Sequence, residues 1–293
     1  VAAGGMALAL NRAVGVEGAA VAGAPSDAST PAPGSALPSV PAPTSSPSGA
    51  ASPTAAVVGA RPTNGSSLTP NGPPLPSGIL DLTNWKLTLP VATGGSSKPQ
   101  EILQPGLAGF AMRPYFMVNA ARTGVVFQAN AGGATTSNSG YPRSELREMA
   151  AHGASEASWS TTSGSSTMTE RLAITHLTAA KPQVTVAQVH DGSDDVLVVR
   201  LDGPHHLYAE HNGRNYGDLD TNYVPGTVFT VEMVASGGHI KIYYNGAQKV
   251  DYPIKSSGDY FKAGCYLQSN TSKGDAADAY AQVVIYGLRV THV

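Results

Sequence analysis

The chain has 293 residues, of which 41% are hydrophobic and 13% are charged. This hydrophobic fraction is enough for a buried core and excludes wholesale disorder, while the length suits one large domain or two ordinary ones. The 18 basic residues nearly cancel the 20 acidic ones, and the formal charge of -2 argues against a general binder of nucleic acids or membrane surfaces. The single cysteine excludes an intrachain disulfide and a multi-cysteine metal site, and no apolar run has the roughly 18 residues that a membrane span needs.

The first 78 residues differ in composition from the rest of the chain. Residues 1–24 are small and apolar and end in Val21-Ala22-Gly23-Ala24, which is typical of a secretory cleavage site, so we expect a signal or anchor remnant and a secreted, extracellular protein. Residues 25–78 carry 13 of the 22 prolines and only two charged residues, Asp27 and Arg61. Such a stretch cannot bury a core, and we interpret it as a Pro/Ser/Ala-rich linker. The functional domain is then expected to span residues 79–293.

Residues 79–293 have the texture of short strands separated by turn residues. Ser236-Gly237-Gly238 and Asn245-Gly246 are typical hairpin turns. Many short strands with hardly any helical periodicity favour an all-β jelly-roll sandwich of two antiparallel sheets. We expect about eleven strands, over residues 85–89, 115–119, 124–128, 144–149, 167–177, 183–190, 196–201, 228–235, 239–244, 260–268 and 281–290.

Three of these strands present a row of polar side chains on one face, because side chains alternate across a sheet with a period of two. The rows are Arg143, Glu145 and Arg147 on the first strand, Gln188 and His190 on the second, and Lys262, Tyr266, Gln268 and Asn270 on the third. On this third strand, Phe261, Ala263, Cys265 and Leu267 occupy the opposite, apolar face.

These rows have two interpretations. A single polar row is often the ordinary solvated face of an antiparallel sandwich. However, Arg, Gln, His and Tyr suit planar contacts and proton transfer better than solvation alone. Because the rest of the domain has few charges, clustering Arg143, Arg147 and Lys262 would create a local positive groove that attracts a polyanion.

Three sequence blocks carrying these rows resemble one known family. The blocks are Arg143-Ser144-Glu145-Leu146-Arg147-Glu148, Gln188-Val189-His190 and Tyr260-Phe261-Lys262-Ala263-Gly264-Cys265-Tyr266-Leu267-Gln268. Together with Trp85-Lys86-Leu87-Thr88-Leu89-Pro90, they resemble polysaccharide lyase family 7, the alginate lyases, over residues 80–293. The resemblance implies a jelly roll whose concave sheet forms the substrate groove. It also implies an endo-acting enzyme that cleaves a polyuronate by β-elimination, with alginate as the anionic partner.

The resemblance also implies roles for individual residues. Arg143 and Gln188, with help from His190, would neutralise the uronate carboxylate. Tyr266 would serve as the acid, and the base would be Tyr266 or His190. The remaining residues of the rows would hold the polymer in neighbouring subsites, and these are Glu145, Arg147, Lys262, Gln268 and Asn270. No metal or other cofactor is implied, and we expect a monomer. Val189, between Gln188 and His190, suggests a preference for mannuronate.

Other functions have less support in the sequence. No Glu-x-Asp-x-x-Glu pattern supports a jelly-roll glucanase, and neither His205-His206 with His211 nor the acidic stretch from Asp191 to Asp195 has the spacing of a metal site. A lyase for another polyuronate, such as glucuronan, and a non-catalytic carbohydrate-binding sandwich remain open. The pairing of Tyr266 with His190 argues for the enzyme, because a binding groove needs no proton-transfer groups.

Overall fold

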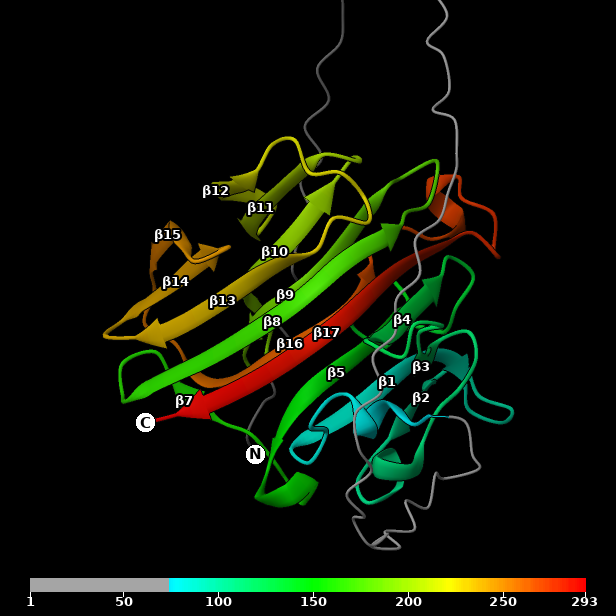
Figure 1. Cartoon of the computed structure of the whole chain (residues 1–293), viewed down its shortest axis with the longest axis horizontal. Coiled ribbons are helices and arrows are strands. Elements are labelled where there is room, and N and C mark those ends of the chain that lie inside the picture. The colour runs from blue at the N-terminus through cyan, green and yellow to red at the C-terminus, as the bar shows by residue number, and fades with distance from the viewer. Residues whose placement is uncertain (1–73) are drawn as a thin grey trace, which may run out of the picture. The chain divides into compact units, whose positions relative to one another are not determined.

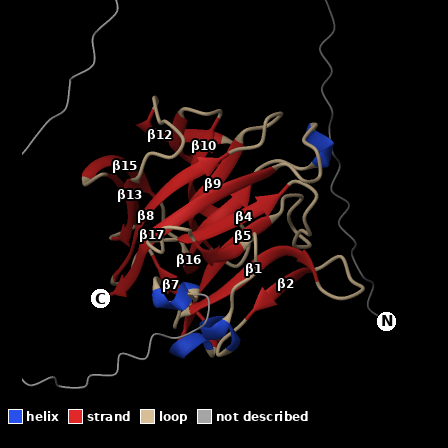
Figure 2. Ribbon diagram, turned by 45° about the vertical axis from the view of Figure 1, so that its right-hand side comes forward, coloured by secondary structure: helices blue, strands red, loops and turns tan. Residues whose placement is uncertain are grey.

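The computed structural model describes residues 74–293, so the predicted signal segment and nearly all of the predicted linker lie outside the described residues. The described part of the chain is an antiparallel β-sandwich of a ten-stranded and a seven-stranded sheet, which confirms the predicted fold class (Figure 1). Its only helical segments are short 3₁₀ turns outside the sheets (Figure 2), namely η1 (Pro76–Gly78), η2 (Gly106–Gly109), η3 (Ala151–Gly153) and η4 (Thr271–Lys273). None of the helices between residues 74 and 293 could cross a membrane.

The larger sheet, called sheet A, carries the three polar rows. At its margin, the short strand β6 (Ser155–Glu156) pairs with β5 (Arg143–Ala150), and the short strand β7 (Trp159–Ser160) pairs with β16 (Ser257–Leu267). Its main strands lie in the order β12 (Arg214–Asp220), β11 (His206–His211), β10 (Asp195–Asp202), β9 (Gln183–His190), β16 (Ser257–Leu267), β5 (Arg143–Ala150), β1 (Trp85–Ala92) and β2 (Pro99–Ile102).

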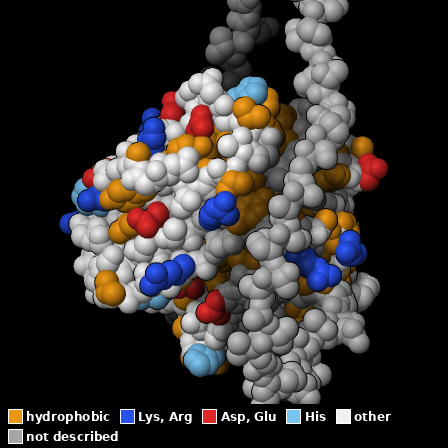
Figure 3. Space-filling model, viewed as in Figure 1, with side chains coloured by type: hydrophobic (Ala, Val, Ile, Leu, Met, Phe, Trp, Pro, Cys, Tyr) orange, Lys and Arg blue, Asp and Glu red, His pale blue; other side chains and the backbone are white. Residues whose placement is uncertain are grey.

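The smaller sheet, called sheet B, covers the apolar face of sheet A. The strands of sheet B lie in the order β15 (Ala247–Pro253), β14 (His239–Tyr244), β13 (Phe229–Ser236), β8 (Ser165–His176), β17 (Tyr280–His292), β4 (Val125–Asn130) and β3 (Phe116–Val118). On the outer face of the molecule seen in Figure 3, basic and acidic side chains are scattered singly.

Local sequence explains why the strands begin and end where they do. β13 and β14 are joined by Gly237 and Gly238, both with positive φ, and β14 and β15 by Asn245 and Gly246, also both positive. Two-residue connections of this kind match the right-handed twist of the strands and require residues that tolerate positive φ. Both predicted hairpin turns are therefore confirmed.

The core lies between the sheets and is built from the alternate residues of each strand. On β16, Phe261, Ala263, Cys265 and Leu267 are fully buried, as the alternation predicts. Burial raises the pKa of the Cys265 thiol, which stays protonated in this core. Val189 on β9 is also fully buried in this core, so it points away from the polar face of sheet A, as predicted.

The predicted strands agree closely with the structure, and two of the missed strands share one physical cause. β9 and β14 have the predicted bounds, while most other strands start or end one to three residues away. The strands that the sequence did not reveal include β2, β12 and β15, at or near sheet edges. β12 and β15 each bury one residue, Leu219 and Val250, and therefore lack a clear apolar alternation.

Candidate active site

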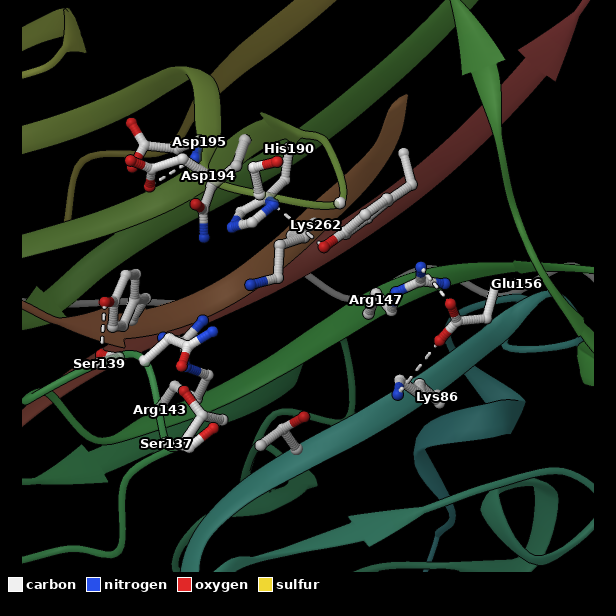
Figure 4. Close-up of a pocket in the computed structure, with 18 of the residues that line it drawn as sticks. Lys86, Ser137, Ser139, Arg143, Arg147, Glu156, His190, Asp194, Asp195 and Lys262 are labelled. Atoms are coloured by element: carbon white, nitrogen blue, oxygen red, sulfur yellow. Dashed lines mark hydrogen bonds and ion pairs between the residues drawn. The ribbon is translucent and has the colours of Figure 1, made fainter. Parts of the chain in front are cut away.

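The concave face of sheet A contains a cavity of about 370 Å³ that crosses the polar rows (Figure 4). Six of the predicted site residues line it, and the loops 131–142 and 191–194 contribute to its walls. The six are Arg143, Arg147, Gln188, His190, Lys262 and Tyr266.

Strand register explains why residues far apart in the sequence meet here. Lys262 on β16 lies opposite Gln188 on β9. Its neighbours on the same face of β16 are Tyr260, which lies opposite His190, and Tyr266, which lies opposite Arg143 on β5. The Lys262 and Gln188 pair is therefore flanked by His190 on one side and by Tyr266 on the other.

Glu145 lies beneath this cavity rather than lining it, and only 2% of its surface is exposed. Its carboxylate accepts a hydrogen bond from Arg143 Nη1 at 2.9 Å and pairs with Lys262 Nζ at 3.0 Å. Gln188 Nε2 donates to the other carboxylate oxygen. Burial favours a raised pKa for Glu145, but the charges of Lys262 and Arg143 outweigh it and hold the pKa below its ordinary value.

The charges of this cluster leave one positive charge uncancelled. Arg143 and Lys262 supply two cations and Glu145 a single anion, and Gln188 is neutral. Burial lowers the pKa of Lys262 to about 8, because the attraction of Glu145 offsets only part of the cost of desolvating the ammonium. A cluster with one excess positive charge in a mostly desolvated setting is suited to binding a carboxylate.

Tyr266 is held by contacts on its ring and its hydroxyl. The guanidinium carbon of Arg143 lies 3.7 Å from the ring centroid, a cation–π contact. The hydroxyl lies 2.7 Å from Ser139 Oγ, on the loop between β4 and β5. These contacts fix the phenol beside the carboxylate-binding cluster, with its hydroxyl at the wall of the cavity.

His190 lies at the end of β9, on the other side of the cluster. Its Nδ1 is 2.6 Å from the carbonyl oxygen of Asp191 and 3.0 Å from the Tyr260 hydroxyl. Burial lowers the pKa of His190, and the nearby charge of Lys262 lowers it further. The imidazole is therefore neutral over a wider pH range than an exposed histidine, as a general base requires.

A network of ion pairs extends the site toward β1 and β2. Arg147 Nη2 pairs with Glu156 at 3.2 Å, and Lys86 Nζ lies 3.8 Å from the same residue (Figure 4). Lys86 Nζ also lies 3.1 Å from Glu101. Its two cations and two carboxylates balance, so this end of the cavity offers polar contacts with little net charge.

Two predicted substrate-binding residues lie outside the lining of the cavity. Gln268 is 5% exposed, and its Nε2 lies 3.4 Å from the backbone oxygen of Tyr266. Asn270 donates to the carbonyl of Gly140 at 2.7 Å and caps η4 by accepting from Ser272 N. Both residues therefore brace the segments around Tyr266, and their contact with substrate stays a prediction.

Some residues of the site were not found from the sequence. Lys86 and Tyr260 line the cavity. Tyr260 is two residues from Lys262 on β16, and Lys86 on β1 lies opposite Arg147, so both side chains share a face with the predicted rows. Alternation along these strands could have identified them. Ser139 lies in a loop, where no periodicity shows which side chains face the cavity. Its contact with Tyr266 depends on the path of that loop.

The histidines weighed as metal ligands are engaged elsewhere. His205 Nδ1 lies 2.9 Å from the Tyr223 carbonyl, His206 pairs with Asp218, and His211 Nδ1 lies 3.0 Å from the Asp195 carbonyl. Within residues 74–293, no group of three His, Cys, Asp or Glu side chains is arranged to hold a metal ion.

The cationic cluster, flanked by His190 and Tyr266 in a cavity of the β-sandwich, is suited to binding an anionic group next to groups that can transfer protons. Comparison with known families agrees, since the alginate lyase family model matches residues 80–292. The chain therefore belongs to this family and is an alginate lyase of polysaccharide lyase family 7.

Solved structures support this assignment. The chain is 55% identical to the alginate lyase AlgAT5 from polysaccharide lyase family 7, covering 75% of this chain and 99% of that one with a TM-score of 0.72. The alginate lyase from Corynebacterium sp. is 50% identical, covering 75% and 98% with a TM-score of 0.71. The family 7 alginate lyase A1-II′, solved as a variant in complex with a substrate designated GGMG, is 28% identical, covering 74% and 96% with a TM-score of 0.62.

Proposed function

We propose that this alginate lyase is endo-acting, cleaves 1,4-linkages by β-elimination and favours mannuronate-rich substrate. The observation that supports the mechanism best is the placement of His190 and Tyr266 on either side of the cluster formed by Lys262, Gln188 and Arg143. A uronate carboxylate bound to that cluster would bring its C5 proton and its O4 within reach of both proton-transfer groups.

The cluster addresses the difficult step of the reaction. Loss of the C5 proton next to an ionised carboxylate builds up a second negative charge as an enolate-like dianion. The excess positive charge of Arg143 and Lys262 over Glu145, with the second N–H of Gln188, stabilises that charge as it develops. Because these groups are already held by Glu145, they need little reorganisation when the charge appears.

The remaining steps are proton transfers. The base takes the proton from C5, the electrons of that bond form the C4–C5 double bond, and the C4–O4 bond breaks. Tyr266 then donates a proton to the departing O4. The product carries an unsaturated uronate at its new non-reducing end. With His190 as the base, the enzyme returns to its starting state once the proton taken from C5 passes back to Tyr266; with Tyr266 as the base, the proton moves from C5 to O4 and the phenolate is left as it began.

The configuration of the sugar decides which group is the base. In mannuronate the C5 proton and O4 lie on the same side of the ring, so Tyr266, starting as the phenolate, can take the proton from C5 and pass that same proton to O4. In guluronate they lie on opposite sides, and His190 becomes the base. Val189 is buried behind the cluster, and its effect on preference is indirect, at the scale of one methylene, or about 0.5–1.5 kcal/mol. We therefore expect a bias toward mannuronate rather than exclusivity.

The test is to incubate the full chain separately with polymannuronate, polyguluronate and glucuronan. Elimination creates a conjugated double bond, so ultraviolet absorbance should rise fastest with polymannuronate, and products of several lengths should appear early if cleavage is internal. Specificity constants that favour polyguluronate would overturn the preference. Release of a single small product from the start would overturn the endo mode.

A further inference from the structure

The two ring nitrogens of His190 have different surroundings. Nδ1 lies 2.6 Å from the carbonyl oxygen of Asp191. A carbonyl oxygen can only accept a hydrogen bond, so Nδ1 carries the proton when the ring is neutral. The lone pair of the neutral ring is then on Nε2, which forms no hydrogen bond with the described residues, and the ring itself lines the cavity.

The Asp191 carbonyl that selects this tautomer is itself held in place. Asp191 Oδ1 accepts from the backbone N–H groups of Ser193 at 2.6 Å and Asp194 at 2.9 Å, which closes the turn directly after β9. This turn fixes the direction of the acceptor. A single hydrogen bond at Nδ1 still leaves the imidazole free to swing about that bond, so a second contact is needed to fix the plane of the ring.

Tyr260 supplies that second contact. It lies opposite His190 across the β16–β9 pair, and the two rings stack with centroids 5.3 Å apart and planes 22° from parallel. The Tyr260 hydroxyl oxygen is 3.0 Å from His190 Nδ1, and because the Asp191 carbonyl places the proton on Nδ1, the hydroxyl oxygen accepts from the same N–H. Tyr260 is in turn held by Arg147, whose guanidinium carbon lies 3.9 Å from its ring centroid, and Arg147 is paired with Glu156.

We propose that Tyr260 is a positioning residue, which holds His190 as the Nδ1–H tautomer with Nε2 directed at the substrate. Arg147 and Glu156 act on His190 through Tyr260. The effect on turnover rests on the proposed function, because it requires His190 to be the base for guluronate. The effect on the tautomer of the free enzyme does not depend on that function.

The kinetic test uses the two uronates as internal controls for each other. Tyr260→Phe keeps the stacking and removes the hydroxyl, and Tyr260→Leu removes both. We expect kcat on polyguluronate to fall about fivefold in the first variant, the size of one hydrogen bond, and further in the second. Turnover of polymannuronate should change less than twofold in Tyr260→Phe, since Tyr266 takes the proton there.

A matched control is Tyr243→Phe on β14 of sheet B, where the lost hydroxyl contacts Gln248. This variant should leave both activities unchanged, and cooperative thermal unfolding of all variants shows that they are folded. Equal losses on both substrates, or a raised KM with kcat unchanged, would indicate that Tyr260 is a structural or sugar-binding residue. Either result overturns the proposal.

The second test reads the tautomer directly in the free protein, by ¹⁵N–¹H NMR of the imidazole groups with His190→Asn for assignment. The unmodified protein should show a protonated Nδ1 and an unprotonated Nε2 at neutral pH, and Tyr260→Phe should show a mixture or line broadening. The charged groups that act on His190 are Lys262, Glu145 and Arg143, and none is changed in these variants. An unaltered His190 spectrum in Tyr260→Phe contradicts the proposal, whereas lyase inactivity of the unmodified protein with the expected spectra contradicts only the proposed function.

Discussion

Strands β13 and β16 both alternate polar and apolar residues, yet they use their polar faces in opposite ways. On β13 in sheet B, the polar positions such as Thr230 and Glu232 are half-buried at the outer surface. On β16 in sheet A, Lys262 is only 9% exposed, and the neighbouring Gln188 and Glu145 are 1% and 2% exposed. Burying charged groups costs free energy, and that cost is offset here because the Glu145 carboxylate pairs with Arg143 and Lys262 and accepts from Gln188. The depth of a polar row, more than its composition, separates the catalytic face from a solvated one.

The largest effect is expected from replacing Tyr266, the proposed proton donor on the polar face of β16. Tyr266→Phe keeps the ring beneath Arg143 and removes the hydroxyl that lies 2.7 Å from Ser139. Turnover on both uronates should fall about a hundredfold or more, because Tyr266 is the acid for both in the proposed mechanism. The thermal unfolding midpoint should move little. Near-normal turnover would refute the role of Tyr266.

A direct comparison of the two faces comes from the same substitution on each. Glu145→Gln breaks a buried charge cluster and should cost about 3 kcal/mol in the free energy of unfolding, together with about a tenfold loss in kcat/KM. Glu232→Gln on β13 should change stability by less than about 0.5 kcal/mol and leave activity unaltered. Denaturant unfolding and initial rates measure both quantities. Similar stability losses in the two variants would show that burial does not distinguish the faces.

The sequence could predict the faces but not their depth. Alternation alone assigned Arg143, Gln188, His190, Lys262 and Tyr266 to polar rows, and strand register brings these rows together. Nothing in the alternation shows that Glu145 sits below its neighbours, because depth is set by the long side chains that cover it. The family resemblance implied that Glu145 holds substrate, which stays a prediction; in the structure its carboxylate is engaged by Arg143, Lys262 and Gln188.

The pH dependence of activity should follow from the same burial. Lys262, with a pKa of about 8, loses its charge as the pH rises through that value, so kcat/KM on either polyanion should decline above pH 8. Lys262→Arg keeps its charge and should extend activity to higher pH, at the cost of altered geometry. Because the pKa of His190 is lowered, the imidazole stays neutral below the ordinary histidine pKa of 6.5. The acid limb of the pH–rate profile should therefore have its midpoint below pH 6.5. Profiles at constant ionic strength test both limbs.

Glu170 on β8 extends the comparison into the core of the sandwich. It is fully buried, and neither carboxylate oxygen has a hydrogen-bond partner among the described residues. Burial raises its pKa well above the ordinary value of 4.5, with a smaller contribution from Glu145. The folded state therefore holds a proton that the unfolded chain releases, so stability is greatest below pH 4.5 for this group and declines as the pH rises toward the folded pKa.

Replacing Glu170 removes this dependence. Glu170→Met has a similar volume and no polar group to desolvate, so it should raise the free energy of unfolding at pH 8 by about 1–3 kcal/mol. The difference between the variant and the unmodified protein should shrink toward pH 4. A gain that is constant between pH 4 and pH 8 would show that the pKa of Glu170 is the same in the folded and unfolded states.

The smallest effect is expected from deleting the proline-rich N-terminal segment that precedes the sandwich domain in the sequence. Residues 1–73 are rich in proline and small residues and lack the apolar content of a core, so deleting them should leave turnover of soluble alginate and the unfolding midpoint unchanged. Deleting residues 1–78 also removes Pro76, which is buried in η1, and the Ser77 hydroxyl, which donates to the Ala108 carbonyl at 2.6 Å. The longer deletion should therefore cost about 1–2 kcal/mol of stability with little loss of turnover. The two deletion variants differ by only five residues, so they separate the role of residues 1–73 from that of residues 74–78. A loss of activity already in the shorter deletion would show that residues 1–73 contribute to substrate binding and would contradict their assignment as a linker.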